Sequence, residues 1–105
     1  MTPTQHALRM LREDNYLAAV VERWNSHARV RQDLFGIIDI LAVRGSECLG
    51  VQATDNTNHS HRVKKLKAAL TTADWLCPPF RRLEVWSFRV DARGKTVRRV
   101  EEIKL

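Results

Sequence analysis

Residues 37–43 read Ile37-Ile38-Asp39-Ile40-Leu41-Ala42-Val43, an apolar run that is interrupted by a single carboxylate. A short run without polar alternation is typical of a strand that is buried on both faces of its sheet. A lone carboxylate in such a strand is strongly destabilising unless it is paired, protonated or bound to a metal. The run therefore predicts a central strand, and Asp39 is the first candidate functional residue.

The dipeptide Gly45-Ser46 separates this run from a second apolar run. Gly-Ser between two strands is a two-residue hairpin signal, because glycine supplies the positive φ of a type II′ turn. This turn places Asp39 opposite Gln52, and opposite residues share a face of the sheet with Cβ atoms roughly 5 Å apart. Thr54 lies two residues further along the same face. We therefore expect a carboxylate, an amide and a hydroxyl to converge on one patch of a central hairpin.

The rest of the chain divides into helical and strand patterns, and its 105 residues leave room for one domain, residues 1–105. Thr4 is expected to cap the first helix, and Asn15 to end it. We expect helices over residues 4–14 and 59–70, strands over residues 16–24, 32–43, 48–54 and 83–90, and a strand or a helix over residues 96–105. This order predicts an α/β domain with a mixed sheet and helices packed on it.

The predicted helix over residues 59–70 is amphipathic and strongly basic. Its apolar face consists of Val63, Leu66 and Leu70 at helical spacing. Its other faces carry four basic residues, namely Arg62, Lys64, Lys65 and Lys67. Residues 56–105 hold twelve Lys or Arg and five Asp or Glu, whereas residues 1–55 hold six Arg and seven acids. A basic half of this kind indicates a polyanion partner, most often nucleic acid, although a solvated basic surface has the same composition.

Several other classes of protein find no support in the sequence. No apolar stretch is long enough to span a membrane, and no secretory pattern opens the chain, so we expect a cytoplasmic protein without a membrane partner. Cys48 and Cys77 belong to no metal or disulfide motif and are expected to be reduced. Nucleotide hydrolysis and serine-type hydrolysis are not indicated, because the chain has neither a Gly-rich phosphate loop nor a Gly-x-Ser-x-Gly motif.

The order of the elements, taken with three short segments, resembles the PD-(D/E)XK nuclease superfamily. The segments are residues 31–40 (RQDLFGIIDI), 50–54 (GVQAT) and 62–65 (RVKK). They look like small phage-type and Holliday-junction-resolvase-like members, and the likeness covers roughly residues 4–90. The resemblance implies a restriction-endonuclease-like fold, with an αβββαβ core and a mixed central sheet flanked by helices. It also implies cleavage of DNA that depends on Mg²⁺ or Mn²⁺.

The same resemblance assigns roles to residues of the hairpin. Asp39 takes the place of the metal-binding Asp, Gln52 the place of the (D/E) and Thr54 the place of the Lys. Two of these depart from the motif, because Gln52 is neutral and a threonine hydroxyl cannot supply a cation to the scissile phosphate. Lys64 or Lys65 is expected to supply that cation from the following helix, as in superfamily members with a displaced lysine.

Three further acids are candidates to complete the metal site. Glu22 is flanked by apolar residues in a predicted strand, and Asp33 precedes the central strand. Glu13, near the end of the first helix, resembles the helix carboxylate of resolvases. An ordinary ion pair with a nearby arginine is the alternative for each of the three.

We therefore expect a Mg²⁺- or Mn²⁺-dependent endonuclease that acts on DNA, branched DNA included, with a metal site of Asp39, Gln52 and Glu22. Asp33, Lys64 and Lys65 are the other candidate catalytic residues. Contacts to nucleic acid are expected from Arg62, Lys64, Lys65 and Lys67. A homodimer is expected because so small a domain carries one site and duplex cleavage needs two. The alternatives are a catalytically decayed nucleic-acid-binding protein of the same fold and a protein-interaction module with a basic face.

Overall fold

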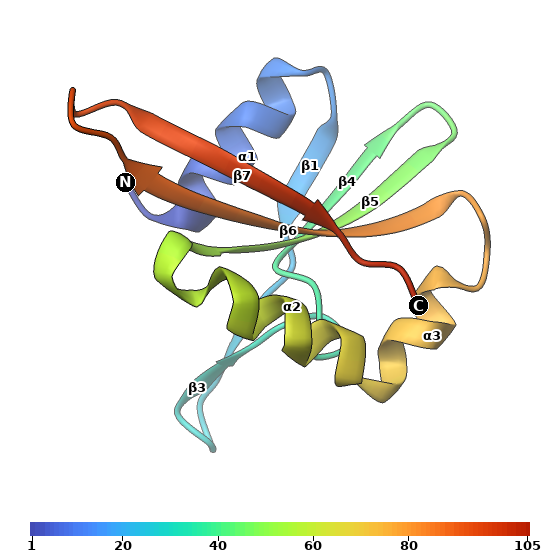
Figure 1. The fold of residues 1–105 in the computed structure, drawn as a ribbon. Coiled ribbons are helices and arrows are strands. Elements are labelled where there is room, and N and C mark those ends of the chain that lie inside the picture. The colour runs from blue at the N-terminus through green and yellow to red at the C-terminus, as the bar shows by residue number, and fades with distance from the viewer.

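We describe the protein from a computed structural model that covers residues 1–105. Its elements follow in the order α1 (Pro3–Glu13), β1 (Leu17–Val20), β2 (Arg23–Asn25), β3 (Val30–Gln32), β4 (Ile40–Arg44), β5 (Glu47–Asp55), the short 3₁₀ helix η1 (Asn56–Asn58), α2 (His59–Ala68), α3 (Leu70–Leu76), β6 (Arg81–Val90) and β7 (Thr96–Glu102). Five strands form one sheet in the order β1-β4-β5-β6-β7, whereas β2 and β3 form a separate two-stranded ribbon (Figure 1). The sheet is mixed, because β5 and β6 are parallel and the other neighbours are antiparallel.

Helices cover both faces of the five-stranded sheet. Helix α1 buries Ala7 and Leu11 in a core cluster that also contains Ile40 and Val51. Helices α2 and α3 bury their apolar residues on the opposite face, in a second cluster around Leu83. The chain is therefore an α/β domain with a mixed sheet flanked by helices, as the sequence predicted, and its central strands are buried on both faces. None of its helices has the length and apolar character needed to cross a membrane.

The β4–β5 hairpin has the predicted register. Arg44 pairs with Glu47 and Ile40 with Val51. Gly45 has a φ of 58°, which fits the first central position of a type II′ turn. Because side chains alternate between the two faces of a strand, Val51 points to the α1 layer and its neighbour Gln52 points to the α2 layer.

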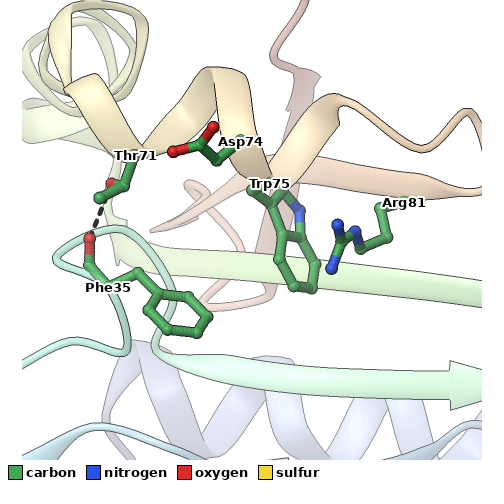
Figure 2. Close-up of a pocket in the computed structure, with 5 residues that line it drawn as sticks. All are labelled: Phe35, Thr71, Asp74, Trp75 and Arg81. Carbon is green, nitrogen blue, oxygen red and sulfur yellow. Dashed lines mark hydrogen bonds between the residues drawn. The ribbon is translucent and has the colours of Figure 1, made fainter.

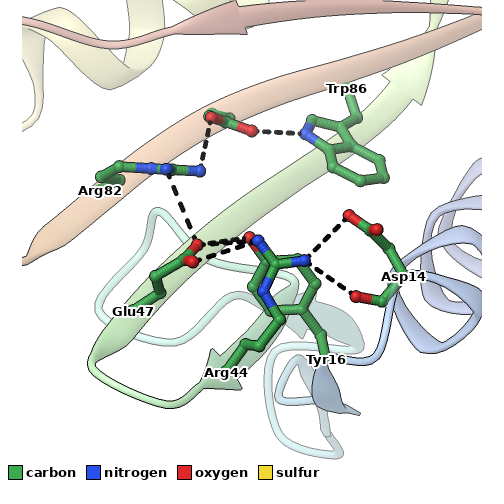
Figure 3. Close-up of polar contacts among 7 residues, drawn as sticks. Asp14, Tyr16, Arg44, Glu47, Arg82 and Trp86 are labelled. Atoms are coloured by element: carbon green, nitrogen blue, oxygen red, sulfur yellow. Dashed lines mark hydrogen bonds and ion pairs between the residues drawn. The ribbon is translucent and has the colours of Figure 1, made fainter.

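A network of polar contacts holds the turn end of this hairpin against the neighbouring elements (Figure 3). Arg44 donates to Glu47 at 3.1 and 3.2 Å and to the backbone oxygen of Asp14, just after α1, at 2.9 Å. The Tyr16 hydroxyl donates to Glu47 at 2.9 Å, and this bond, with help from Arg44, lowers the pKa of Glu47. Arg82 of β6 lies 4.0 Å from the same carboxylate. These contacts fix the end of the hairpin that lies away from Asp39.

Two predicted strands are shorter than expected, because part of each predicted range belongs to the two-stranded ribbon. The strand predicted over residues 16–24 is split, because β1 ends at Val20 and β2 belongs to the ribbon. The strand predicted over residues 32–43 begins only at Ile40. Phe35 and Gly36 have φ values of 56° and 75°, and such positive angles reverse the chain rather than extend it.

The predicted helices differ from the structure at their ends. The first helix is capped by Thr2 rather than Thr4, in a capping box with Gln5, because Pro3 occupies the first helical position. The basic helix ends at Ala68, and Leu70 begins a separate helix. Leu70 was predicted on the buried apolar face of the basic helix, but its side chain is 93% exposed. The region predicted as a strand or a helix over residues 96–105 is the strand β7. Cys48 and Cys77 are free, as expected for reduced cysteines.

Candidate metal centre

Three carboxylates meet on the α2 side of the sheet. Glu22, Asp33 and Asp39 each offer one oxygen, and these oxygens lie within 4.8 Å of one another. Asp39 is 5% exposed, and the side chains of Glu22 and Asp33 are each 14% exposed. Carboxylates that are this close together and this well buried repel one another unless a proton or a cation lies between them. The structure therefore brings together three of the acids that the sequence indicated as candidates.

The strand register explains how two of these acids meet. Arg23 pairs with Gln32 at the base of the β2–β3 ribbon. Glu22 directly precedes this pair and Asp33 directly follows it, on the side toward the body of the protein. Asp39 comes from the end of the central strand, where its carboxylate accepts a hydrogen bond from the backbone N–H of Ala53 at 2.9 Å. The three acids therefore come from three different segments. The ribbon separates Glu22 from Asp33, and a reversal of the chain separates Asp33 from Asp39.

That reversal is a tight turn between Asp33 and Asp39. Phe35 and Gly36 are its central residues, and the N–H of Ile37 donates to the carbonyl oxygen of Leu34 at 3.1 Å. Positive φ at both central residues is the signature of a type I′ turn.

Helix α3 holds this turn in place (Figure 2). The Thr71 hydroxyl donates to the Phe35 carbonyl oxygen at 2.8 Å. A pocket of about 270 Å³ lies beside this contact, and Trp75 and Arg81 form part of its lining. Packing of α3 against the turn thus fixes the position of Asp33 relative to Asp39.

Asp39 and Asp33 are close enough to share a proton. Burial raises the pKa of Asp39 to about 8, and the hydrogen bond with Asp33 and its negative charge act in the same direction. Burial alone would also raise the pKa of Asp33. Hydrogen bonds with Asp39 and Gln52 outweigh that effect and, together with two nearby cations, lower the pKa of Asp33. The pair therefore carries one proton near neutral pH when no cation is bound.

Gln52 supports the centre in a different way from the one predicted. It is fully buried; its amide nitrogen donates to Asp33 and to the carbonyl oxygen of Ile37, both at 3.0 Å. Its amide oxygen accepts from Arg62 at 3.0 Å. The opposite orientation would turn the oxygen toward two acceptors and the nitrogen toward a donor, so these partners fix the amide. Gln52 was predicted as a metal ligand, but it presents its nitrogen to the carboxylates and positions Asp33 instead.

Helix α2 brings two of its four cations to the centre. The Lys65 ammonium lies 3.7 Å from the Asp33 carboxylate, and Arg62 lies one turn earlier on the same face. Lys64 and Lys67 are exposed, and at about 100° per residue they lie about 100° and about 160° around the helix from Lys65. Of the two lysines predicted to replace the missing motif lysine, only Lys65 lies beside the carboxylates. Lys64 was also predicted to be catalytic; it makes no ion pair with the carboxylates, and that role stays a prediction.

The remaining candidate residues are resolved by their position. Glu22 forms an ion pair with Arg31 at 3.1 Å, which is the alternative given for it, and it also belongs to the carboxylate group. Its role as a metal ligand stays a prediction. Glu13 lies on α1, which covers the opposite face of the sheet, and pairs with Arg9 at 3.8 Å. Its predicted role as a resolvase-type helix carboxylate is therefore wrong. Thr54 is buried but makes no hydrogen bond to the three carboxylates.

An open cleft of about 520 Å³ leads to the centre. It is lined by Arg31, Gln32, Asp33, Phe35, Gly36 and Lys65. One wall comes from the two-stranded ribbon, one from the tight turn and one from α2. A chain with negative charge that entered this cleft would pass beside the carboxylates and contact two basic side chains.

No protein-family model, curated protein or solved structure matches this chain. The resemblance to the PD-(D/E)XK superfamily therefore stays a prediction from the sequence.

Proposed function

We propose that the protein is a metal-dependent nuclease that hydrolyses DNA phosphodiester bonds at the centre formed by Glu22, Asp33 and Asp39. The observation that carries the proposal is the grouping of three largely buried carboxylates beside Lys65 and an open cleft. A structural ion-pair network would place a cation against each acid. Here Glu22 pairs with Arg31 and Asp33 with Lys65, but Asp39 has no cation and shares a proton with Asp33 instead. An arrangement of this kind favours binding of a divalent cation.

The donor set fits Mg²⁺ or Mn²⁺. Both are hard cations that prefer carboxylate oxygens, and three such oxygens within 4.8 Å can converge on one ion. When bound, such an ion supplies Lewis-acid stabilisation of charge on the phosphate and lowers the pKa of water. The ligands from this chain would be Glu22, Asp33 and Asp39, with Gln52 holding Asp33 in position.

The cations of α2 would bind the phosphate. Lys65 is 41% exposed and reaches the edge of the centre, so its ammonium can contact both Asp33 and an incoming phosphate oxygen. Arg62 places one N–H on Gln52, while its Nε is buried and has no hydrogen-bond partner. An unpaired buried donor is a position that an anion oxygen would satisfy. These two side chains would therefore replace the lysine that the motif has at Thr54.

Replacing Lys65 by alanine is expected to lower the rate of DNA cleavage by roughly a hundredfold, because a positioned cation that stabilises the transition state is lost. Replacing Lys64 by alanine removes the same charge from a position about 100° around α2, without a contact to the carboxylates, and is expected to change the rate by less than about threefold. Single-turnover cleavage of both variants at saturating protein would measure the difference. Equal losses in the two variants would mean that α2 contributes only its net charge.

The proposed function is tested by incubating labelled duplex DNA and a four-way junction with the protein and Mn²⁺ or Mg²⁺. Cleavage that requires the metal and is lost in Asp39→Ala, but kept in Glu13→Gln on the opposite face, would support the proposal. If the folded wild-type protein binds DNA in a salt-sensitive way but does not cut it, the protein is the non-catalytic alternative. Two observations support that alternative, namely the fixed orientation of the Gln52 amide and the neutral side chain of Thr54. Each chain carries one centre, so we propose that a homodimer is needed to cut both strands.

A further inference from the structure

The two-stranded ribbon, residues 23–32, projects from the body of the protein (Figure 1), and its base adjoins Glu22 and Asp33 of the carboxylate group. Nine of its ten residues are exposed. It carries three arginines and no acidic residue, namely Arg23, Arg29 and Arg31. A projecting ribbon with this charge attracts a polyanion, and a two-stranded ribbon is narrow enough to enter a groove of nucleic acid.

Trp24 is the one tryptophan of the chain that is not in a core. Its exposed fraction is 61%, whereas those of Trp75 and Trp86 are 7% and 5%. Trp75 and Trp86 also donate their indole N–H groups to protein acceptors, and Trp24 makes no such bond. A large aromatic side chain held in solvent on a basic surface is typical of a binding contact rather than of packing.

The ribbon register places Trp24 on the same face of the ribbon as Arg31. Trp24 pairs with Arg31 across the ribbon, and directly paired residues share a face. Residues two apart on one strand share that face as well, so Glu22 lies on it too. The ion pair of Glu22 with Arg31 at 3.1 Å agrees with this arrangement. The indole therefore lies on the face that carries the acids, two residues or roughly 7 Å from Glu22 along the strand.

We propose that Trp24 stacks on an unpaired base next to the phosphate held at the metal centre, so that the substrate is forked or branched DNA rather than blunt duplex. The inference rests on the proposed function, which supplies the strand. Because Trp24 lies only roughly 7 Å from Glu22 along the strand, a base that stacks on the indole would lie close to the phosphate held at the centre. An indole stacks on any base whose face is exposed, and only unpaired bases offer a free face. Arg31 and the neighbouring arginines neutralise the backbone.

The test compares binding of a forked DNA with binding of a blunt duplex of equal length, in EDTA so that cleavage plays no part. Trp24→Ala is expected to weaken binding of the fork by roughly tenfold and binding of the blunt duplex by less than about twofold. Trp24→Phe keeps an aromatic face and should retain most of the preference for the fork. Phe80→Ala removes an aromatic side chain that is 57% exposed on a different loop, and should leave both affinities unchanged. Fork binding should also quench the emission of wild type, but not of Trp24→Ala.

Three results would overturn the inference. Trp24→Ala binding the fork as tightly as wild type would show that the indole makes no contact. Equal losses on fork and blunt duplex would show a general contact instead of stacking. A changed oligomeric state of Trp24→Ala with unchanged DNA binding would show that a second copy of the chain covers the indole. If the preference for the fork depends on Trp24 but the protein never cuts DNA, the stacking proposal holds and the nuclease proposal is wrong. If wild type cuts DNA and Trp24→Ala has no effect on fork binding, the nuclease proposal holds and the stacking proposal is wrong.

Discussion

Replacing Asp39 by asparagine is expected to stabilise the metal-free protein at about pH 8.5, by on the order of 2 kcal/mol. Burial and the neighbouring Asp33 raise the pKa of Asp39 to about 8 from its ordinary value of 3.8. The protonated carboxyl therefore stabilises the folded state, and this contribution is complete below about pH 4 and lost as the pH rises through about 8. Asparagine is neutral throughout, can still accept from Ala53 and can donate to Asp33 where the carboxyl shares its proton.

The measurement is urea unfolding of wild type and Asp39→Asn in EDTA at about pH 4.5 and pH 8.5. The two proteins should be nearly equal at the lower pH, and the variant should be more stable at the higher pH. Glu13→Gln is the control, because Glu13 is exposed and pairs with Arg9 on the opposite face of the sheet. A variant that is less stable than wild type at both pH values would show that the Asp39 charge is already compensated inside the protein.

Replacing Gln52 by glutamate is expected to have opposite effects on the metal-free and the metal-bound protein. A carboxylate at this position cannot donate to Asp33 or to the Ile37 carbonyl oxygen, and it places a negative charge about 3 Å from that of Asp33. The metal-free protein should lose roughly 3 kcal/mol of stability, as when a buried polar network is broken. The added charge should tighten binding of Mn²⁺ by roughly tenfold, because a fourth carboxylate oxygen joins the site.

Thermal unfolding in EDTA and in excess Mn²⁺ separates the two effects. Gln52→Glu should unfold at a lower temperature than wild type in EDTA, and its unfolding temperature should rise more on addition of Mn²⁺. Gln52→Leu has a similar volume without the amide, so it should lose stability in EDTA without a larger response to Mn²⁺. A Gln52→Glu protein that responds to Mn²⁺ no more than Gln52→Leu would place the ion away from Asp33.

The central hairpin was predictable from the sequence because its determinants are local. Gly45-Ser46 specifies a two-residue turn, and a two-residue turn fixes every pair along both strands. The apolar run around Asp39 has no polar alternation, and this absence indicated burial on both faces before any packing was known. The register of the hairpin and the burial of Asp39 and Gln52 follow from these two features, and the mixed sheet with flanking helices follows from the order of the elements.

The parts that were mispredicted depend on contacts between distant segments. The orientation of the Gln52 amide is set by Arg62 on α2 and by the carbonyl oxygen of Ile37, neither of which sequence spacing reveals. The turn at Phe35-Gly36 is unusual because Phe35 adopts a positive φ, held there by its contact with α3. The two lysines next to each other on α2 were indistinguishable until the helix phase was fixed by its buried residues.

The ribbon had a signal that strand propensity obscured. Residues 16–24 are rich in residues that favour strands and read as one continuous strand, so Trp24 was grouped with the central sheet. The change of composition to a basic segment without acids over residues 23–32 marks where the chain leaves the sheet. Glu22 lies at that boundary, which is why an acid among apolar residues belongs to the group of three carboxylates.

The most direct measurement is a calorimetric titration of the protein with Mn²⁺ near neutral pH in several buffers. Wild type is expected to bind one ion per chain and to release about one proton, because the proton shared by Asp33 and Asp39 must leave when the cation enters. Asp39→Asn should abolish binding, and Glu22→Gln should weaken it. The account is contradicted if folded wild-type protein binds no Mn²⁺, or if it binds Mn²⁺ equally well without the Asp39 carboxylate.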